Sequence, residues 1–352
     1  MKAFKIVLFS LFFFTSYNSQ ASDQVKNIAV IATGGTIAGS GDSEVGSKYS
    51  GAKVSIDKII KNIPNISKLA NVSAEQLFQV NSQDLNDELW LKIANRTNEL
   101  LSKSSVDGVV ITHGTDTMEE TAYFLNLVVK SKKPVILVGS MRPSTSSSAD
   151  GTLNLYNAIA LAGSDEAYKK GVLILMNDEI YTARDASKTH TTNVASFKAN
   201  NSGPIGFVHY GKVEIYYNSN RLHTSKSEFS IKNLSELPKV DILYAYVNSE
   251  SSVVDQLVAS GAKAIIVAGV GDGNVNKKTL EKLSAAQKKG VIIVRSSRVG
   301  VGLVEPNVEI SDDDLGFVTA DNLSPQKARI LTMMALTKTD DLKKIRVMFE
   351  KY

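Results

Sequence analysis

The sequence contains no cysteine and only four histidines, and both shortages narrow its chemistry. Without a thiol the chain has no disulfide framework, no cysteine nucleophile and no thiolate ligand for a metal ion. The histidines are scattered and form no HExxH or similar spacing: His113, His190, His209 and His223. We therefore expect no structural or catalytic zinc ion and no other metal, and we expect packing to supply the stability.

A strong charge of either sign is also missing. The formal net charge is +4, and basic and acidic residues are interspersed along the chain. There is no electrostatic footprint for nucleic acid and no polybasic patch for a membrane surface. Neither partner is expected, and a small molecule remains the expected ligand.

Long apolar runs are absent except near the start of the chain. Lys2 and Lys5 precede the apolar run 6–14, and small residues follow around Ala21. This pattern predicts a secretory signal peptide over residues 1–21, cleaved after Ala21. The run is too short to span a bilayer, so we expect an exported and soluble mature protein.

The stretch 27–39, NIAVIATGGTIAG, is the first that indicates a site. The apolar run 28–32 ends in a turn with Gly34 and Gly35, as a buried parallel strand does at its carboxyl end, where ligands bind in open α/β sheets. The two glycines allow a tight turn that presents the hydroxyl of Thr36. Thr36 is then either a nucleophile or part of a glycine-rich turn that binds phosphate, and this stretch alone does not separate the two.

The next segment, 39–51, holds four glycines and four serines and almost no apolar side chain. It is interpreted as a mobile loop, either a lid over the substrate or an ordinary flexible connection. Tyr49 is its one aromatic residue. Its phenol would serve in the site as a proton relay or hydrogen-bond partner, or would anchor the loop.

Further polar side chains follow other apolar strands. Ser82 and Gln83 lie where a strand meets a helix, and they either cap that helix or hold a polar ligand. Thr115 and Asp116 follow the strand 108–112, where Asp116 and Glu119 would also suit a capping box. Lys188 lies in the polar turn 183–193 and either tunes a nucleophile or is a solvated surface lysine.

Apolar strands alternate with helical patterns through most of the chain, which predicts an α/β fold with mostly parallel sheets. We expect a large N-terminal domain over 22–217, a linker over 218–239 and a smaller, flavodoxin-like α/β domain over 240–352. The segment GVGDG at 269–273 lacks the GxGxxG spacing, so no nucleotide cofactor is expected.

Five motifs, in this order, closely resemble those of the bacterial type II L-asparaginases, the periplasmic branch of the asparaginase/glutaminase family. They are ATGGTIAG with Thr36, NSQD with Ser82 and Gln83, THGTDTMEETAYF with Thr115 and Asp116, GSMRPS, and RDASKTHT with Lys188. The resemblance extends over nearly the whole mature chain, including HTS near His223, RSSRV at 295–299 and PQKAR at 325–329.

The resemblance implies an amidohydrolase that converts L-asparagine to L-aspartate and ammonia without a cofactor. Thr36 matches the nucleophile of the family and Tyr49 its loop tyrosine, and an acyl-enzyme would form and be hydrolysed. Thr115, Lys188 and Asp116 match a second triad that favours the alkoxide. Ser82, Gln83 and Asp116 would hold the α-carboxylate and α-ammonium groups of the substrate.

The family resemblance further implies a periplasmic homotetramer built from close dimers. Its sites lie at the dimer interface, and Glu309 matches a glutamate that the neighbouring subunit contributes near the substrate amine. On sequence alone, Glu309 would be a surface acid.

Some positions depart from the asparagine-selective pattern. Ser140 stands where selective members carry alanine, Asp272 stands where the family usually has asparagine, and NDEI at 177–180 is closer to the glutaminase-asparaginases; Gln83 is the residue of the selective type. One methylene separates the two substrates and is worth only ~1–3 kcal/mol. A broad glutaminase-asparaginase is therefore the alternative, and a periplasmic amino-acid binding protein is a more distant one.

Overall fold

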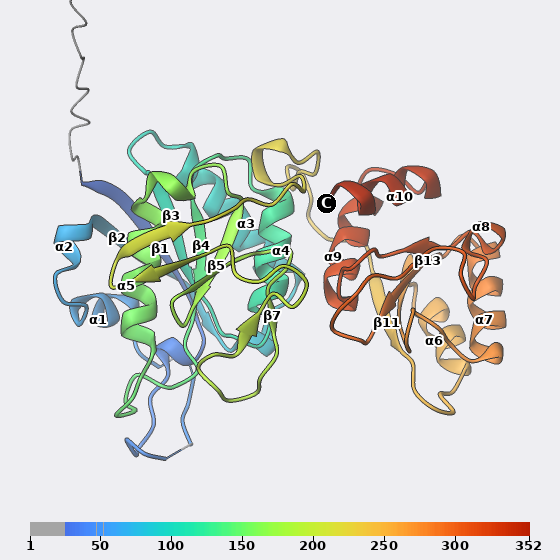
Figure 1. Cartoon of the computed structure of the whole chain (residues 1–352), viewed down its shortest axis with the longest axis horizontal. Helices are drawn as coiled ribbons and strands as arrows, with labels where there is room; N and C mark the ends of the chain where they lie inside the picture. Colours follow the sequence, from blue (N-terminus) through green and yellow to red (C-terminus); the bar gives the residue numbers. More distant parts are fainter. Residues whose placement is uncertain (1–24, 47, 52) are drawn as a thin grey trace, which may run out of the picture.

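The computed structural model describes residues 25–46, 48–51 and 53–352, which form two α/β domains side by side (Figure 1). The predicted signal peptide, residues 1–21, lies outside the described residues. No helix within the described ranges is long and apolar enough to cross a membrane.

The N-terminal domain is built on an eight-stranded sheet in the order β10-β9-β6-β5-β4-β3-β1-β2. Its strands are Lys26–Gly34 (β1), Ala70–Val80 (β2), Gly108–Thr112 (β3), Val135–Val138 (β4), Val172–Met176 (β5), Glu179–Thr182 (β6), Gly206–His209 (β9) and Lys212–Ile215 (β10). The strands β2, β1, β3, β4 and β5 are parallel, and β6, β9 and β10 continue the sheet in antiparallel pairs. The short pair Ser187–Lys188 (β7) and Phe197–Lys198 (β8) forms a separate ribbon.

Helices cover both faces of this sheet, so its central strands β1, β3, β4 and β5 are buried on both sides. The helices of the domain are Ile56–Lys61 (α1), Ile66–Leu69 (α2), Asp87–Ser102 (α3), Met118–Val128 (α4) and Gly151–Gly163 (α5), with 3-10 turns at Thr36–Ala38 (η1), Ser82–Asp84 (η2), Asp165–Ala167 (η3) and Thr224–Lys226 (η4). Alternate residues of β1 belong to different hydrophobic clusters: Ile28 and Val30 pack with α5, while Ala29 and Ile31 pack with α3 and α4.

The C-terminal domain has a four-stranded parallel sheet in the sequential order β11-β12-β13-β14. This order differs from the 2-1-3-4-5 order of flavodoxin. Its elements are Val240–Tyr244 (β11), Ser252–Ala259 (α6), Ala264–Gly269 (β12), Lys277–Lys288 (α7), Ile292–Ser297 (β13), Asp312–Leu315 (α8), Val318–Thr319 (β14), Pro325–Leu336 (α9) and Leu342–Lys351 (α10). Side chains of α6 and α7 pack on one face of the sheet, and those of α9 and α10 on the other.

The helices α4 and α9 join the two domains. They pack against one another, and one hydrophobic cluster runs from β3 and β4 through both helices to β12 and β13. In Figure 1, α9 is the C-terminal element that faces the N-terminal domain. The segment 218–239 also contributes to this cluster, through the buried side chains of Phe229, Ile231 and Leu237.

The predicted α/β fold class, a large domain with a mostly parallel sheet and a smaller parallel α/β domain, is confirmed. The strand expected over 108–112 is β3 without change. The strands β2 (Ala70–Val80) and β11 (Val240–Tyr244) have bounds that the apolar pattern of the sequence does not mark. Both lie at sheet edges, where one partner strand and partial exposure weaken the apolar pattern that marks a strand.

Candidate active site

The turns that follow β1, β2, β3 and β4 lie at one edge of the parallel sheet. Because these strands are parallel and adjacent, their carboxyl ends bring the turns together. Thr36 follows β1, Ser82 follows β2, and Thr115 with Asp116 follows β3. The sheet thus explains how residues far apart in the sequence meet at one site.

Close backbone packing fixes these turns relative to one another. Gly35 has a φ of 81°, and a Cβ atom on it would lie 2.4 Å from the backbone nitrogen of Gly114. A Cβ atom on Gly114 would lie 2.8 Å from that of Ser82. The Thr117 hydroxyl also donates to the Ser82 carbonyl oxygen at 2.8 Å. Glycine is therefore required at Gly35 by both space and conformation.

Thr36 and Tyr49 form the first hydroxyl pair of the site. Their oxygen atoms are 2.9 Å apart, and the Tyr49 side chain comes from the glycine-rich loop. That loop is joined across its base by two backbone hydrogen bonds between Ser40 and Ser50. The predicted proximity of Tyr49 to Thr36 is thus observed, and either oxygen can donate to the other.

Thr115, Lys188 and Asp116 form the second group. The Lys188 ammonium donates to the Thr115 hydroxyl at 3.0 Å and to the Asp116 carboxylate at 2.6 Å. Thr115 is 5% exposed, whereas the Asp116 side chain is 60% exposed. A cation beside a hydroxyl stabilises the alkoxide form of that hydroxyl, and the exposed carboxylate remains open to a ligand.

The helix-capping role considered for Ser82, Gln83 and Asp116 and the solvated position considered for Lys188 are not observed. Asn86, and not Ser82 or Gln83, caps α3 by accepting a hydrogen bond from Leu89 N. The residue before α4 is Thr117, which makes no side-chain cap, so the capping box expected for Asp116 is absent there. Lys188 is not a solvated surface lysine, since its side chain is only 16% exposed.

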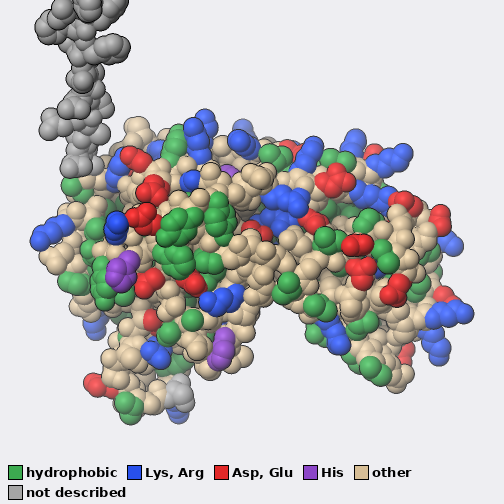
Figure 2. All heavy atoms as spheres, viewed as in Figure 1, with side chains coloured by type: hydrophobic (Ala, Val, Ile, Leu, Met, Phe, Trp, Pro, Cys, Tyr) green, Lys and Arg blue, Asp and Glu red, His purple; other side chains and the backbone are tan. Residues whose placement is uncertain are grey.

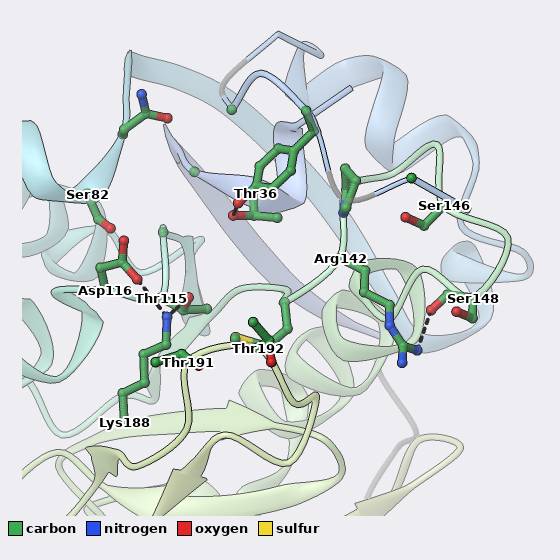
Figure 3. Close-up of a pocket in the computed structure, with 18 of the residues that line it drawn as sticks. Thr36, Ser82, Thr115, Asp116, Arg142, Ser146, Ser148, Lys188, Thr191 and Thr192 are labelled. Carbon is green, nitrogen blue, oxygen red and sulfur yellow. Dashed lines mark hydrogen bonds and ion pairs between the residues drawn. The ribbon is translucent and has the colours of Figure 1, made fainter. Parts of the chain in front are cut away.

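A cavity of about 870 Å³ unites the two groups. Its wall includes Gly35, Thr36, Tyr49, Ser82, Gln83, Thr115, Asp116, Arg142, Ser146, Ser148, Lys188, Thr191 and Thr192. Figure 3 shows Thr36 beside the Thr115, Asp116 and Lys188 group, with Arg142 and Ser148 farther along the wall. The cavity is lined by hydroxyl, amide and charged groups, which suits a small, strongly polar ligand.

Ser140, Asp272 and Glu309 are not part of this wall in the described chain. Ser140 is fully buried and donates to the Arg142 carbonyl oxygen at 2.8 Å, which supports the β4 turn from behind. Asp272 and Glu309 belong to the C-terminal domain. Asp272 accepts from the Glu305 N–H at 2.9 Å, and Glu309 accepts from the Asn274 amide at 2.9 Å.

His113 lies between β3 and the Thr115 turn and is fully buried. Its Nδ1 atom is 2.7 Å from the Gly114 carbonyl oxygen, which only accepts, so Nδ1 carries the hydrogen. The Nε2 atom has no protein partner among the described residues. Burial lowers the pKa of His113 to about 4, although the bond to Gly114 opposes this shift, so the ring is neutral near pH 7.

No group of three or more potential metal ligands occurs within residues 25–46, 48–51 and 53–352. Three charged side chains at the cavity have hydrogen-bond partners: Lys188 binds Asp116, and Arg142 binds the backbone. The Arg142 guanidinium donates to the Ser148 carbonyl oxygen at 2.9 Å, and the Arg142 backbone N–H donates to the Asp150 carboxylate at 3.0 Å. The side chains that line the cavity offer hydroxyl, amide, ammonium, guanidinium and carboxylate groups.

Sequence reasoning did not assign a role to several residues that shape the site. Arg142, Ser146 and Ser148 lie in the serine-rich turn after β4, and Thr191 and Thr192 follow β7. The only feature of the sequence that could have indicated them is that they lie in polar turns directly after strands. Glu119 also accepts a hydrogen bond from the Lys188 backbone, and Gln326 binds Glu119; only their three-dimensional positions reveal these contacts.

Comparisons with known proteins match both parts of the chain to one protein family. A family model described as "Asparaginase, N-terminal" matches residues 27–221, and one described as "Glutaminase/Asparaginase C-terminal domain" matches residues 239–349. The chain is 47% identical over 352 residues to a probable periplasmic L-asparaginase of Haemophilus influenzae, covering 100% of both chains. It is 49% identical over 335 residues to a glutaminase-asparaginase of Pseudomonas fluorescens biotype A, covering 95% of this chain and 92% of the relative.

A crystal structure of a probable cytoplasmic L-asparaginase from Campylobacter jejuni is also similar. It aligns with a TM-score of 0.90 and 49% sequence identity, covering 93% of this chain and 100% of that chain. The names of these similar proteins differ in substrate range and in compartment.

Proposed function

Because the chain belongs to the asparaginase family, we propose that it hydrolyses the side-chain amide of L-asparagine to L-aspartate and ammonia. The observation that supports this proposal most directly is the pairing at one cavity of Thr36 with Tyr49, and of Thr115 with Lys188 and Asp116. No cofactor takes part in the proposed reaction.

In the proposed mechanism, the Thr36 hydroxyl oxygen attacks the carboxamide carbon and its proton passes to the Tyr49 oxygen, 2.9 Å away, while Tyr49 releases its own phenol proton toward the leaving nitrogen. Backbone N–H groups of the turns stabilise the negative charge on the amide oxygen. The C–N bond then breaks, the nitrogen takes up the proton, and ammonia leaves an acyl-enzyme. Water attacks the ester carbon and gives a proton through Tyr49 to the Thr36 oxygen as the bond between that oxygen and the carbon breaks, which releases L-aspartate and restores the Thr36 hydroxyl.

The second group has two tasks in this proposal. The Lys188 ammonium, 3.0 Å from the Thr115 hydroxyl, lowers the cost of removing a proton from it. The exposed Asp116 carboxylate binds the substrate ammonium, and Ser82 and Gln83 hold the α-carboxylate end. Fixing both ends of a small substrate orients its amide toward Thr36.

Ammonia release from L-asparagine by the wild-type protein and by Thr36→Ala tests this proposal. We expect turnover by the wild type and a loss of about 10³-fold or more in kcat for the variant. Thr319→Ala, which changes a threonine of β14 outside the cavity, is the matched control. A folded wild-type protein that binds amino acids without releasing ammonia would instead indicate the amino-acid binding protein.

The second candidate function is a broader glutaminase-asparaginase. The cavity of about 870 Å³ has room for the additional methylene, and Ser140 and Asp272 depart from the asparagine-selective pattern. In this reading Ser140 acts through the β4 turn, because its side chain is buried behind the wall. The ratio of kcat/KM for L-glutamine to that for L-asparagine distinguishes the two functions.

We further propose a homotetramer of close dimers in the periplasm, reached through cleavage after Ala21. The assembly would allow a second copy to bring Glu309 and Asp272 to the cavity around Thr36, which neither residue lines within one described chain. The proposed domains are 22–217 and 240–352, joined by 218–239.

A further inference from the structure

The backbone that carries Lys188 is held by residues of the C-terminal domain. The Lys327 ammonium donates to the Arg184 carbonyl oxygen at 2.8 Å and to that of Ala186. The Arg184 guanidinium in turn donates to Asp321 at 3.1 Å and to Asn322 at 2.6 Å. The segment just before Lys188 is thus held at Arg184 and Ala186 by side chains in the first turn of α9 and directly before it.

Glu119 connects the same region to Lys188 itself. Its carboxylate accepts the Lys188 backbone N–H at 3.0 Å on one oxygen and the Gln326 side-chain amide at 2.6 Å on the other. Glu119 is 6% exposed and lies in the first turn of α4, directly after the turn that holds Thr115 and Asp116. Both carboxylate oxygens therefore have defined partners that bring two domains together.

This arrangement fixes the reach of the Lys188 side chain. Its backbone nitrogen is bound to Glu119, while its ammonium is bound to Thr115 and Asp116, which lie four and three positions before Glu119 in the same turn-helix unit. A displacement of the backbone at Lys188 is therefore transmitted to the ammonium. A shift of about 1 Å at a catalytic group costs up to ~10²-fold in rate.

Lys327 acts as a buried cation in this structure. It is 1% exposed, and burial lowers the pKa of its ammonium while the nearby Glu119 and Asp185 carboxylates raise it. The backbone carbonyls of Arg184 and Ala186 accept two of its three hydrogens. Buried ammonium groups are retained only with such partners, so Lys327 ties the segment 184–188 to α9.

We propose that Glu119 and Gln326 form a positioning bridge between the domains, supported by Lys327, that sets the Lys188 ammonium against Thr115. This inference rests on the proposed function, because it assigns the positioning residues for the Lys188 group. Neither Glu119 nor Gln326 is among the residues that line the cavity around Thr36 in the described ranges, so both act through Lys188.

An exchange of the two side chains tests the bridge. In Gln326→Glu, two carboxylates face one another where a hydrogen bond of 2.6 Å stood, and their repulsion displaces the Lys188 backbone. In the double variant Glu119→Gln with Gln326→Glu, the new amide accepts from Lys188 N–H and donates to the new carboxylate. The bridge is restored with its donor and acceptor reversed.

We expect kcat of Gln326→Glu to fall by about 10- to 100-fold with little change in KM, and kcat of the double variant to return to within about threefold of wild type. Gln256→Glu, on the exposed surface of α6, makes the same chemical change outside the bridge and should leave kcat unaltered. A purely structural contribution would lower the thermal midpoint without a selective effect on kcat.

Gln326→Ala keeps the inference falsifiable if Gln326→Glu does not fold, since it removes the donor without adding charge. Equal kcat values for wild type and Gln326→Ala, or a double variant no better than Gln326→Glu, would overturn the bridge. The variant Lys188→Met separates failure of the bridge from failure of the proposed function. If Lys188→Met keeps full activity, the proposed role of Lys188 is wrong. If Lys188→Met is inactive while the bridge variants keep wild-type kcat, only the bridge is refuted.

Discussion

At the scale of single residues, the Tyr49 hydroxyl is placed to relay the proton of Thr36. Replacing Tyr49 with phenylalanine removes only the oxygen that lies 2.9 Å from Thr36 Oγ1. We expect kcat for L-asparagine to fall by about 10²- to 10⁴-fold, the range of a lost acid-base group. Steady-state ammonia release measures this, with Tyr168→Phe at an exposed position as the control. A variant with wild-type kcat would limit Tyr49 to anchoring the loop.

His113 leads to a prediction about stability and pH. Its folded-state pKa is about 4, against 6.5 for an unperturbed histidine, so the unfolded chain takes up a proton between these values while the folded chain does not. The free energy of unfolding should therefore fall by about 3 kcal/mol as the pH decreases from 6.5 to 4.

Chemical denaturation at several pH values checks this prediction. His113→Gln should show a correspondingly smaller loss over the same range, because glutamine does not titrate. The exposed His209→Gln should follow the wild type. Parallel curves for the wild type and His113→Gln would show that His113 does not cause the effect.

Among single residues, the sequence predicted contacts at the site only for those to which a resembling motif gave a role. The Thr36 turn, the tyrosine of the loop and the Thr115, Asp116 and Lys188 group were predicted, and their mutual contacts are observed. Gln326 lies in the resembling stretch PQKAR, but that stretch assigned it no role, and its partner Glu119 is 207 positions away. The roles of all these residues in catalysis stay predictions.

At the scale of the elements, the turn after β1 depends on Gly35. A side chain there would meet the backbone of Gly114 at 2.4 Å and would also adopt an unfavourable φ of 81°. Gly35→Ala should therefore destabilise the fold by about 3 kcal/mol or more and abolish turnover. Gly163→Ala is the matched control, since its new methyl group would meet only Lys26 atoms at 3.7 Å or beyond.

Thermal unfolding and ammonia release of the two glycine variants test this prediction together. An active Gly35→Ala protein with an unchanged thermal midpoint would show that the two turns can separate without cost. The sequence indicated a tight turn at this position, but the partner that makes it tight, Gly114, comes from a strand order that local patterns do not specify.

At the scale of the whole molecule, the C-terminal domain is proposed to serve two cavities: it supports the one in its own chain and completes the one in a second copy. Within one chain, α9 supports the Lys188 segment through Gln326 and Lys327. Asp272 and Glu309 lie elsewhere in that domain and are proposed to serve a second copy. Figure 2 shows an open notch between the two domains along one edge of the view.

Mixing two impaired variants tests the proposed shared site. Thr36→Ala and Glu309→Ala, combined in one assembly, should generate sites in which both residues are intact, so the mixture should be more active than either variant alone. Thr36→Ala mixed with Tyr49→Phe should give no such gain, because both residues belong to one domain of one chain. Equal activity before and after mixing and refolding would contradict a site built from two copies.

The connection between Arg184 and Asn322, which spans 138 positions, also imposes an order of events during synthesis. The strands of the large sheet are complete once β10 has been made, whereas Asp321, Gln326 and Lys327 follow only after most of the second domain. A growing chain thus holds its Lys188 segment without these partners until α9 docks. Full amidohydrolase activity should consequently appear only after the whole chain has been synthesised, and nascent chains that lack α9 should not hydrolyse L-asparagine.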